Sequence, residues 1–250
     1  MMIEQDPSPN HNDRDPAKPV DVLLLHYTGM LSGEGAVRWL CNPASQVSSH
    51  YVVHEDGRVV QLVEEARRAW HAGRGSWFEE TDLNTRSVGI EIVNPGHNFG
   101  YRPFPDVQIA AVIALSRAIL GRHPIPPERV LAHSDIAPLR KEDPGELFPW
   151  DVLHAAGIGH WVPPVPAAGA AVEEGPVLRP GDAGAAVAAL QERLRAYGYG
   201  LGEAGTYGEE TAAVVRAFQR HFRPARVDGL ADVSTRETLD RLIAALPSRP

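Results

Sequence analysis

The apolar residues of the chain form short runs and helical stripes that predict alternating strands and helices. Runs typical of buried strands lie at residues 20–25, 49–53, 58–63, 87–93 and 130–132. The second and third runs flank Asp56-Gly57, a pair that predicts a hairpin turn. Apolar residues at helical spacing predict a helix at 106–120, and we expect short helices at 33–40 and 150–161. This order predicts an α/β fold with a mixed central β-sheet flanked by helices.

Two changes in composition divide the chain into parts. Residues 1–18 are polar and charged, which predicts a disordered N-terminal arm before a catalytic domain at 19–161. Residues 162–176 are rich in Pro, Ala and Gly and predict a linker. Amphipathic stripes then predict a small all-α domain of three helices at 177–247, with helices over 185–196, 209–222 and 234–245.

The overall composition excludes several classes of protein. The 24 basic and 32 acidic residues give a net charge of −8 without a basic stripe, which argues against nucleic acid as a partner. The single Cys41 excludes an intrachain disulfide and a Cys-rich metal site. No apolar run approaches the ~18 residues of a transmembrane segment. The N-terminus has neither the apolar core of an export signal nor a lipid-attachment cysteine, which predicts a cytoplasmic protein.

Candidate metal ligands stand where predicted strands end. His133 follows the run at 130–132, and Lys141 and Asp143 come within eleven residues of it, in a proline-rich loop. Imidazole and carboxylate are two of the ligand types that zinc takes. A catalytic zinc needs a third protein ligand in addition to His133 and Asp143. His26 ends the run at 20–25. Because the ends of neighbouring strands converge at one sheet edge, we expect these side chains to meet.

Two further charged residues have both a chemical and a structural interpretation. In the run at 87–93, Gly89, Glu91 and Val93 share the face opposite Val88, Ile90 and Ile92, so an ionisable carboxyl lies in an apolar strand. Glu91 is either a proton shuttle or one half of a structural ion pair. Lys141 either stabilises a developing oxyanion or is a solvated loop charge.

Five separated motifs add a family resemblance over about residues 18 to 160. They are His26-Tyr27-Thr28, Ser49-His50-Tyr51, Ala69-Trp70-His71-Ala72-Gly73, the segment from Ser87 to Gly96 and the segment from His133 to Trp150. In this order they resemble the zinc-dependent N-acetylmuramoyl-L-alanine amidases of the AmpD/AmiD type, in the type-2 amidase family. The resemblance implies one Zn²⁺ per chain, held by His26, His133 and Asp143. It further implies Glu91 and Lys141 as the catalytic pair, and Trp70, His71 and Asn94 as candidate substrate contacts.

The implied reaction is hydrolysis of the amide between the lactyl group of N-acetylmuramic acid and L-alanine. The implied substrate is peptidoglycan or an (anhydro)muropeptide, in cell-wall turnover and recycling. A non-catalytic peptidoglycan recognition protein and a phage-type lytic amidase are the alternatives. Some recognition proteins do not cleave because they lack a zinc ligand, whereas all three ligand positions are filled here.

The C-terminal helices carry a second resemblance. Leu178-Arg179-Pro180-Gly181-Asp182, Thr206-Tyr207-Gly208 and Phe218-Gln219 are similar to the peptidoglycan-binding type-1 domain. The alternative is an appendage that packs on the enzyme and binds nothing. Binding of wall polymer would place the protein in the periplasm or cell envelope, against the cytoplasmic prediction from the N-terminus. We expect a monomer.

Overall fold

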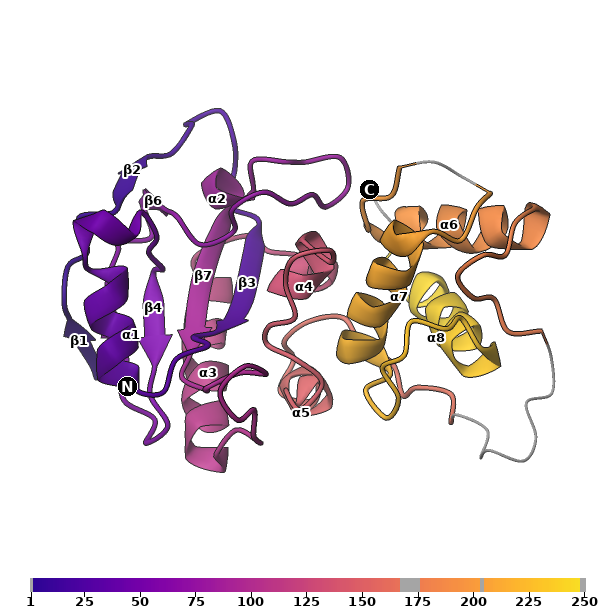
Figure 1. Cartoon of the computed structure of the whole chain (residues 1–250). Coiled ribbons are helices and arrows are strands. Elements are labelled where there is room, and N and C mark those ends of the chain that lie inside the picture. Colours follow the sequence, from indigo (N-terminus) through magenta and orange to yellow (C-terminus); the bar gives the residue numbers. More distant parts are fainter. Residues whose placement is uncertain (1, 167–175, 203–204, 248–250) are drawn as a thin grey trace.

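The computed structural model describes residues 2–166, 176–202 and 205–247 (Figure 1). Its centre is a six-stranded sheet whose spatial order, with bounds, is β1 (Ile3–Gln5), β5 (Val59–Gln61), β4 (Tyr51–Val53), β7 (Ser87–Ile92), β3 (Val22–Tyr27) and β8 (Val130–Ala132). All neighbours are parallel except β4 and β5, which form the hairpin predicted around Asp56-Gly57. The predicted mixed sheet is confirmed.

Helices cover both faces of this sheet. Helix α3 (Asp106–Leu120) packs against β4 and β7, and its apolar stripe, including Val112 and Leu115, shares one hydrophobic cluster with Leu23 and Leu25 of β3. Helix α1 (Gly33–Leu40) lies on the opposite face, over β4 and β5 (Figure 1). The other face of β3 is buried in a separate cluster, in which Val22 and Leu24 pack with Leu131 and Ile136. Burial on both faces explains why the sequence of β3 is an almost unbroken apolar run.

Shorter elements connect these layers. The structure adds α2 (Leu83–Arg86), α4 (His133–Ile136), α5 (Trp150–Ala155) and the 3₁₀ turns Pro43–Ser45 and Pro127–Arg129. Helix α4 starts at His133, so one helical turn precedes the proline-rich loop that carries Lys141 and Asp143. Among the described residues, no helix combines the length and apolarity needed to cross a bilayer.

The prediction that residues 1–18 form a disordered arm is wrong. Strand β1 adds to the sheet edge beside β5, and β2 (His11–Asp13) pairs with β6 (Arg67–Ala69). The Arg14 guanidinium donates to the carbonyls of Glu65 and Ser87, at 2.9 and 2.8 Å. The arm is ordered by backbone pairing and by hydrogen bonds from polar side chains, and these contacts leave little apolar signal in the sequence.

The C-terminal module, residues 177–247, has the three predicted helices, α6 (Ala185–Tyr197), α7 (Glu209–Phe222) and α8 (Val233–Ala244). One hydrophobic cluster joins it to the first domain, since Trp77 and Ile136 pack with Tyr199 and Phe218. Trp77 is fully buried at this junction. Residues 167–175 of the predicted linker lie outside the described residues. The module is therefore packed on the first domain through a shared apolar core.

Candidate metal centre

Three functional candidates form a row across neighbouring parallel strands. In the pairing of β3 with β7, His26 lies opposite Glu91. In the pairing of β3 with β8, Leu25 lies opposite Ala132, and His133 is the next residue. All three residues lie at the carboxyl ends of their strands, where the ligand sites of open α/β sheets gather. The register of the sheet thus brings together residues that are far apart in sequence.

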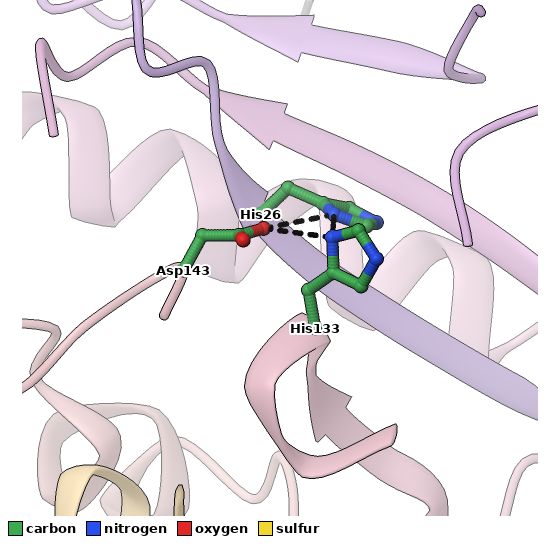
Figure 2. Close-up of side chains that lie close together, drawn as sticks. All are labelled: His26, His133 and Asp143. Atoms are coloured by element: carbon green, nitrogen blue, oxygen red, sulfur yellow. Dashed lines mark hydrogen bonds and ion pairs between the residues drawn. The ribbon is translucent and has the colours of Figure 1, made fainter. Parts of the chain in front are cut away.

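Asp143 completes a cluster of three buried donor groups (Figure 2). The Nδ1 atoms of His26 and His133 are 2.9 Å apart, and they lie 3.1 and 3.0 Å from Oδ2 of Asp143. Tetrahedral zinc with ligands at about 2.0–2.2 Å places its ligand atoms roughly 3.3 Å apart. The three donors therefore fit one small divalent ion, with a fourth position left for water or substrate.

The protonation states of the cluster also suit a metal. Burial lowers the pKa of His26 to about 4, so its imidazole is neutral near pH 7. Burial alone would raise the pKa of Asp143, but the adjacent His133 and His26 hold it well below its usual range. Neutral imidazole and ionised carboxylate are the forms that bind metal. The Nε2–H of His133 donates to the Ala72 carbonyl at 2.9 Å, which leaves its Nδ1 lone pair free for the cluster.

A chain of hydrogen bonds fixes the orientation of His26. Its Nε2 lies 3.0 Å from Nδ1 of His71, and Nε2 of His71 lies 3.2 Å from Oγ of Ser87. The Ser87 hydroxyl donates to the Leu83 carbonyl, so it accepts from His71 Nε2–H. His71 Nδ1 then accepts from His26 Nε2–H. We call His71 and Ser87 the supporting pair, because they turn the Nδ1 lone pair of His26 toward the metal position.

Glu91 stands beside the cluster with an unusual carboxyl group. Its Oε2 atom is buried, and no described residue hydrogen-bonds to it. Burial raises the pKa of Glu91 well above its ordinary 4.5, the Asp143 charge adds to this, and the Lys141 charge opposes it. A carboxyl whose pKa is raised in this way is a stronger base than an ordinary glutamate and can both take and return a proton. Lys141 lines the same cavity, two residues before Asp143.

The cluster opens into a cavity of about 400 Å³ that can hold a substrate. Trp39, Val47 and Trp70 contribute to its wall, and Trp39 is 49% exposed. Of the predicted substrate contacts, Trp70 and His71 line the cavity, although His71 is also bonded to His26. Asn94 does not line it: its amide donates to the Arg102 carbonyl at 2.7 Å and accepts from Gly96 N at 3.0 Å. Asn94 therefore shapes a neighbouring loop.

Sequence reasoning missed the supporting role of His71 and Ser87. One signal was available in Gly89, a glycine inside an otherwise apolar strand, which often marks a close approach of another group. A Cβ atom at Gly89 would lie 2.5 Å from Nδ1 of His71, so the missing side chain makes room for that imidazole.

The family comparison agrees with this geometry. The family model described as N-acetylmuramoyl-L-alanine amidase matches residues 16–146, more than half of the chain, and this range includes His26, Glu91, His133, Lys141 and Asp143. The chain belongs to the N-acetylmuramoyl-L-alanine amidase family. A model of the peptidoglycan binding domain family matches residues 183–239, which lie within the C-terminal module.

Relatives of this amidase share most of its length. N-acetylmuramoyl-L-alanine amidase AmiD of Escherichia coli is 39% identical over 236 residues, covering 90% of this chain and 82% of AmiD. The 1,6-anhydro-N-acetylmuramyl-L-alanine amidase AmpD of Enterobacter cloacae is 31% identical, covering 60% of this chain and 87% of AmpD. The AmpD match thus covers much less of this chain than the AmiD match.

Solved structures confirm the fold of both parts. The structure of E. coli AmiD in complex with anhydro-N-acetylmuramic acid-L-Ala-D-gamma-Glu-L-Lys matches with a TM-score of 0.75 and 38% identity, over 93% of this chain and 92% of AmiD. AmpDH3 of Pseudomonas aeruginosa matches with a TM-score of 0.77 and 36% identity, over 92% of this chain and 93% of AmpDH3. The arrangement of a mixed sheet with a helical C-terminal module is therefore shared with other amidases.

Proposed function

We propose that this amidase hydrolyses the bond between the lactyl group of N-acetylmuramic acid and L-alanine, with one zinc ion held by His26, His133 and Asp143. The observation that carries the proposal is the triangle of three donor atoms, 2.9–3.1 Å apart, at the base of a cavity. The filled ligand set favours catalysis over the predicted alternative of a recognition protein that binds without cleaving.

The residues around the triangle divide the chemistry between them. When bound, zinc supplies a Lewis acid that polarises the scissile carbonyl and makes water a better nucleophile near neutral pH. Glu91 accepts the proton of the attacking water and returns it to the nitrogen of the departing L-alanine. The Lys141 ammonium stabilises the negative charge that develops on the carbonyl oxygen. The buried Oε2 of Glu91, which has no hydrogen-bond partner among the described residues, supports its role as the proton shuttle.

Two relatives support a soluble substrate. AmiD was solved with an anhydro-muramyl tripeptide, and AmpD is named as a 1,6-anhydro-N-acetylmuramyl-L-alanine amidase. We infer that this chain also cleaves anhydro-muropeptides, in cell-wall recycling, and that its C-terminal module binds wall polymer. The match of residues 183–239 to the peptidoglycan binding domain model supports the second inference.

The test combines metal analysis with one digestion. The purified chain should contain one zinc ion and convert an anhydro-muramyl tripeptide into anhydro-N-acetylmuramic acid and free tripeptide, as detected by mass spectrometry. Removing zinc with a chelator should abolish cleavage, and adding zinc should restore it. Binding of the tripeptide without cleavage by the zinc-loaded chain would favour a recognition protein.

Three further points stay predictions. Cell fractionation distinguishes the predicted cytoplasmic location from the periplasm or cell envelope, and light scattering in solution tests the expected monomer. Lysis of intact cells by added protein would favour the phage-type alternative.

A further inference from the structure

One buried contact between the two parts of the chain involves a carboxylate two residues from a proposed metal ligand. Asp135 lies in α4, two residues after His133, and its side chain is fully buried. Its Oδ1 accepts from the Tyr199 hydroxyl at 2.7 Å, and its Oδ2 accepts from Nδ1 of His221 at 2.7 Å and from the Ala132 amide at 2.8 Å. Two of these three donors come from the C-terminal module. A buried carboxylate depends on such partners, so α4 is held in place from the module side.

A second contact reaches the loop that carries Lys141 and Asp143. Arg220 of α7 donates to Oε1 of Glu142 at 2.6 Å, and its Nε lies 3.8 Å from Glu146. Arg220 is 9% exposed, whereas the Glu142 side chain is 49% exposed, so the ion pair is shielded from water on the Arg220 side only. Because Glu142 lies between Lys141 and Asp143 in sequence, the contact fixes the backbone at the proposed ligand and the proposed catalytic cation together.

Stacked rings add to the contact at this junction. The His221 imidazole stacks on Trp150 with centroids 3.7 Å apart, and Trp150 begins α5 directly after the metal loop. Figure 1 shows α7 facing α4 and α5 across the junction. The same helix of the module therefore contacts the elements before and after the loop.

We propose that the C-terminal module positions residues of the catalytic centre, with Tyr199, Arg220 and His221 as the positioning residues. Through Asp135 they hold the helix that begins with His133, and through Glu142 they hold the loop that carries Lys141 and Asp143. The proposal rests on the proposed function for the roles of those three residues. It differs from the usual role of a wall-binding appendage, which concentrates an enzyme on its polymer and leaves the chemistry unchanged.

A soluble substrate separates the two roles, because an anhydro-muramyl tripeptide needs no wall-binding module. In the full-length chain, Tyr199→Phe removes only the hydroxyl that reaches Asp135. Arg220→Met removes the ion pairs with Glu142 and Glu146, the two glutamates of the loop. Each has a matched control in the same module. Tyr207 is equally buried, but its hydroxyl donates to Gly229 at 2.7 Å. Arg216 lies one turn before Arg220 and pairs with Glu209 at 2.7 Å.

We expect Tyr199→Phe and Arg220→Met each to weaken zinc affinity by about tenfold, the lower end of the effect of residues that support metal ligands. They should also lower kcat on the tripeptide, with a smaller change in KM. Tyr207→Phe and Arg216→Met should leave zinc affinity and kcat within about twofold of the parent, even where they lower the melting temperature. Zinc affinity is measured by competition with a chromogenic chelator.

Two results would overturn the proposal. In the first, Tyr199→Phe and Arg220→Met bind zinc and turn over tripeptide as the parent does, which would leave the module as an appendage. In the second, Tyr207→Phe and Arg216→Met cause equal losses, which would mean that general stability of the module explains the effect. If the parent chain cleaves no tripeptide, the proposed function fails, whereas the zinc affinities still decide whether the module positions the metal ligands.

Discussion

The Nε2 atom of His26 lies 3.0 Å from Nδ1 of His71, and this contact decides which nitrogen of His26 faces the metal position. His71 can play this part only while it is neutral. Burial lowers the pKa of His71 well below 6.5, and the neighbouring His26 adds to the effect. His71 therefore stays an acceptor at Nδ1 near neutral pH, with Ser87 holding its other nitrogen.

Replacing His71 tests this arrangement. We expect His71→Ala to reduce zinc affinity about 10–100-fold, because His26 loses the acceptor that fixes its tautomer and ring orientation. His71→Asn should recover part of the affinity, since the amide oxygen can stand near the position of Nδ1. Chelator competition measures both, with the exposed His154→Ala as the control. Equal zinc affinity in His71→Ala and His154→Ala would contradict the supporting role of His71.

Gly89 gives a second route to the same contact. An added Cβ would lie 2.5 Å from Nδ1 and 2.6 Å from Cε1 of His71, so the ring must shift. We expect Gly89→Ala to weaken zinc binding about tenfold through the displaced imidazole. Gly208→Ala is the control, because nothing lies within 4 Å of a Cβ at that position. Unchanged zinc affinity in Gly89→Ala would mean that the ring moves without disturbing His26.

Replacing the proposed ligand Asp143 and replacing the proposed proton shuttle Glu91 should affect zinc content and turnover differently. Asp143→Ala removes one of three donors, so we expect loss of stoichiometric zinc and of turnover together. Glu91→Gln keeps the three donors, so we expect full zinc content with kcat lowered about 10²–10⁴-fold. Metal analysis and tripeptide digestion on the same samples check both variants. Turnover at the parent rate by Glu91→Gln would remove Glu91 from the mechanism.

The carboxyl ends of the apolar strands were readable from sequence, because a run such as 20–25 stops at His26 and the run at 130–132 stops before His133. Parallel pairing then brings those ends to one sheet edge, as the register shows. Asp135 could not be recognised in this way. Its two donors from the module lie 64 and 86 residues later in the chain, and only the packed structure shows that they reach it.

The N-terminal arm was mispredicted for a different physical reason. Strands β1 and β2 have three residues each and few apolar side chains, so no periodic pattern marks them. Edge pairing and the buried Ser8 and Asn10 hold them in place, and such hydrogen bonds depend on partners elsewhere in the fold.

The raised pKa of Glu91 predicts a pH dependence of activity. Glu91 must be ionised to accept the proton of the attacking water, so kcat/KM should rise with pH as this group loses its proton. Because burial raises its pKa well above 4.5, we expect this rise at a higher pH than for an ordinary glutamate. A pH profile of kcat/KM on the tripeptide measures it. A profile already flat above pH 4.5 would mean that the zinc-loaded chain does not keep the raised pKa of Glu91.

The same shift has a consequence for stability, with a definite sign. Between pH 4.5 and its raised folded pKa, Glu91 binds a proton in the folded chain but not in the unfolded chain. The free energy of unfolding therefore falls as pH rises through this window. Glu91→Gln removes this loss, so the metal-free variant should gain stability relative to the metal-free parent between pH 4.5 and pH 7. Urea unfolding at the two pH values measures the difference, and a constant difference would refute the shift.

Arg14 connects the N-terminal arm to the support of the metal site. Its guanidinium donates to the carbonyls of Asn84 and Ser87, at 3.1 and 2.8 Å. These bonds hold the segment that contains Ser87, one member of the supporting pair. Burial lowers the pKa of Arg14 to about 10, so it stays charged at neutral pH. We expect Arg14→Met to lower the free energy of unfolding by about 3 kcal/mol, because several carbonyls lose a charged donor. Exposed Arg38→Met should change it by less than about 0.5 kcal/mol.

Zinc affinity distinguishes this support from a general effect on stability. If Arg14 holds Ser87 in place for His71, Arg14→Met should weaken zinc binding as well as lowering the urea midpoint. A shortened chain starting at residue 19 should show both losses, because it lacks Arg14 and strands β1 and β2. If Arg14→Met, Arg38→Met and the parent have the same urea midpoint, the arm does not stabilise the fold. That result is the one expected of a disordered arm.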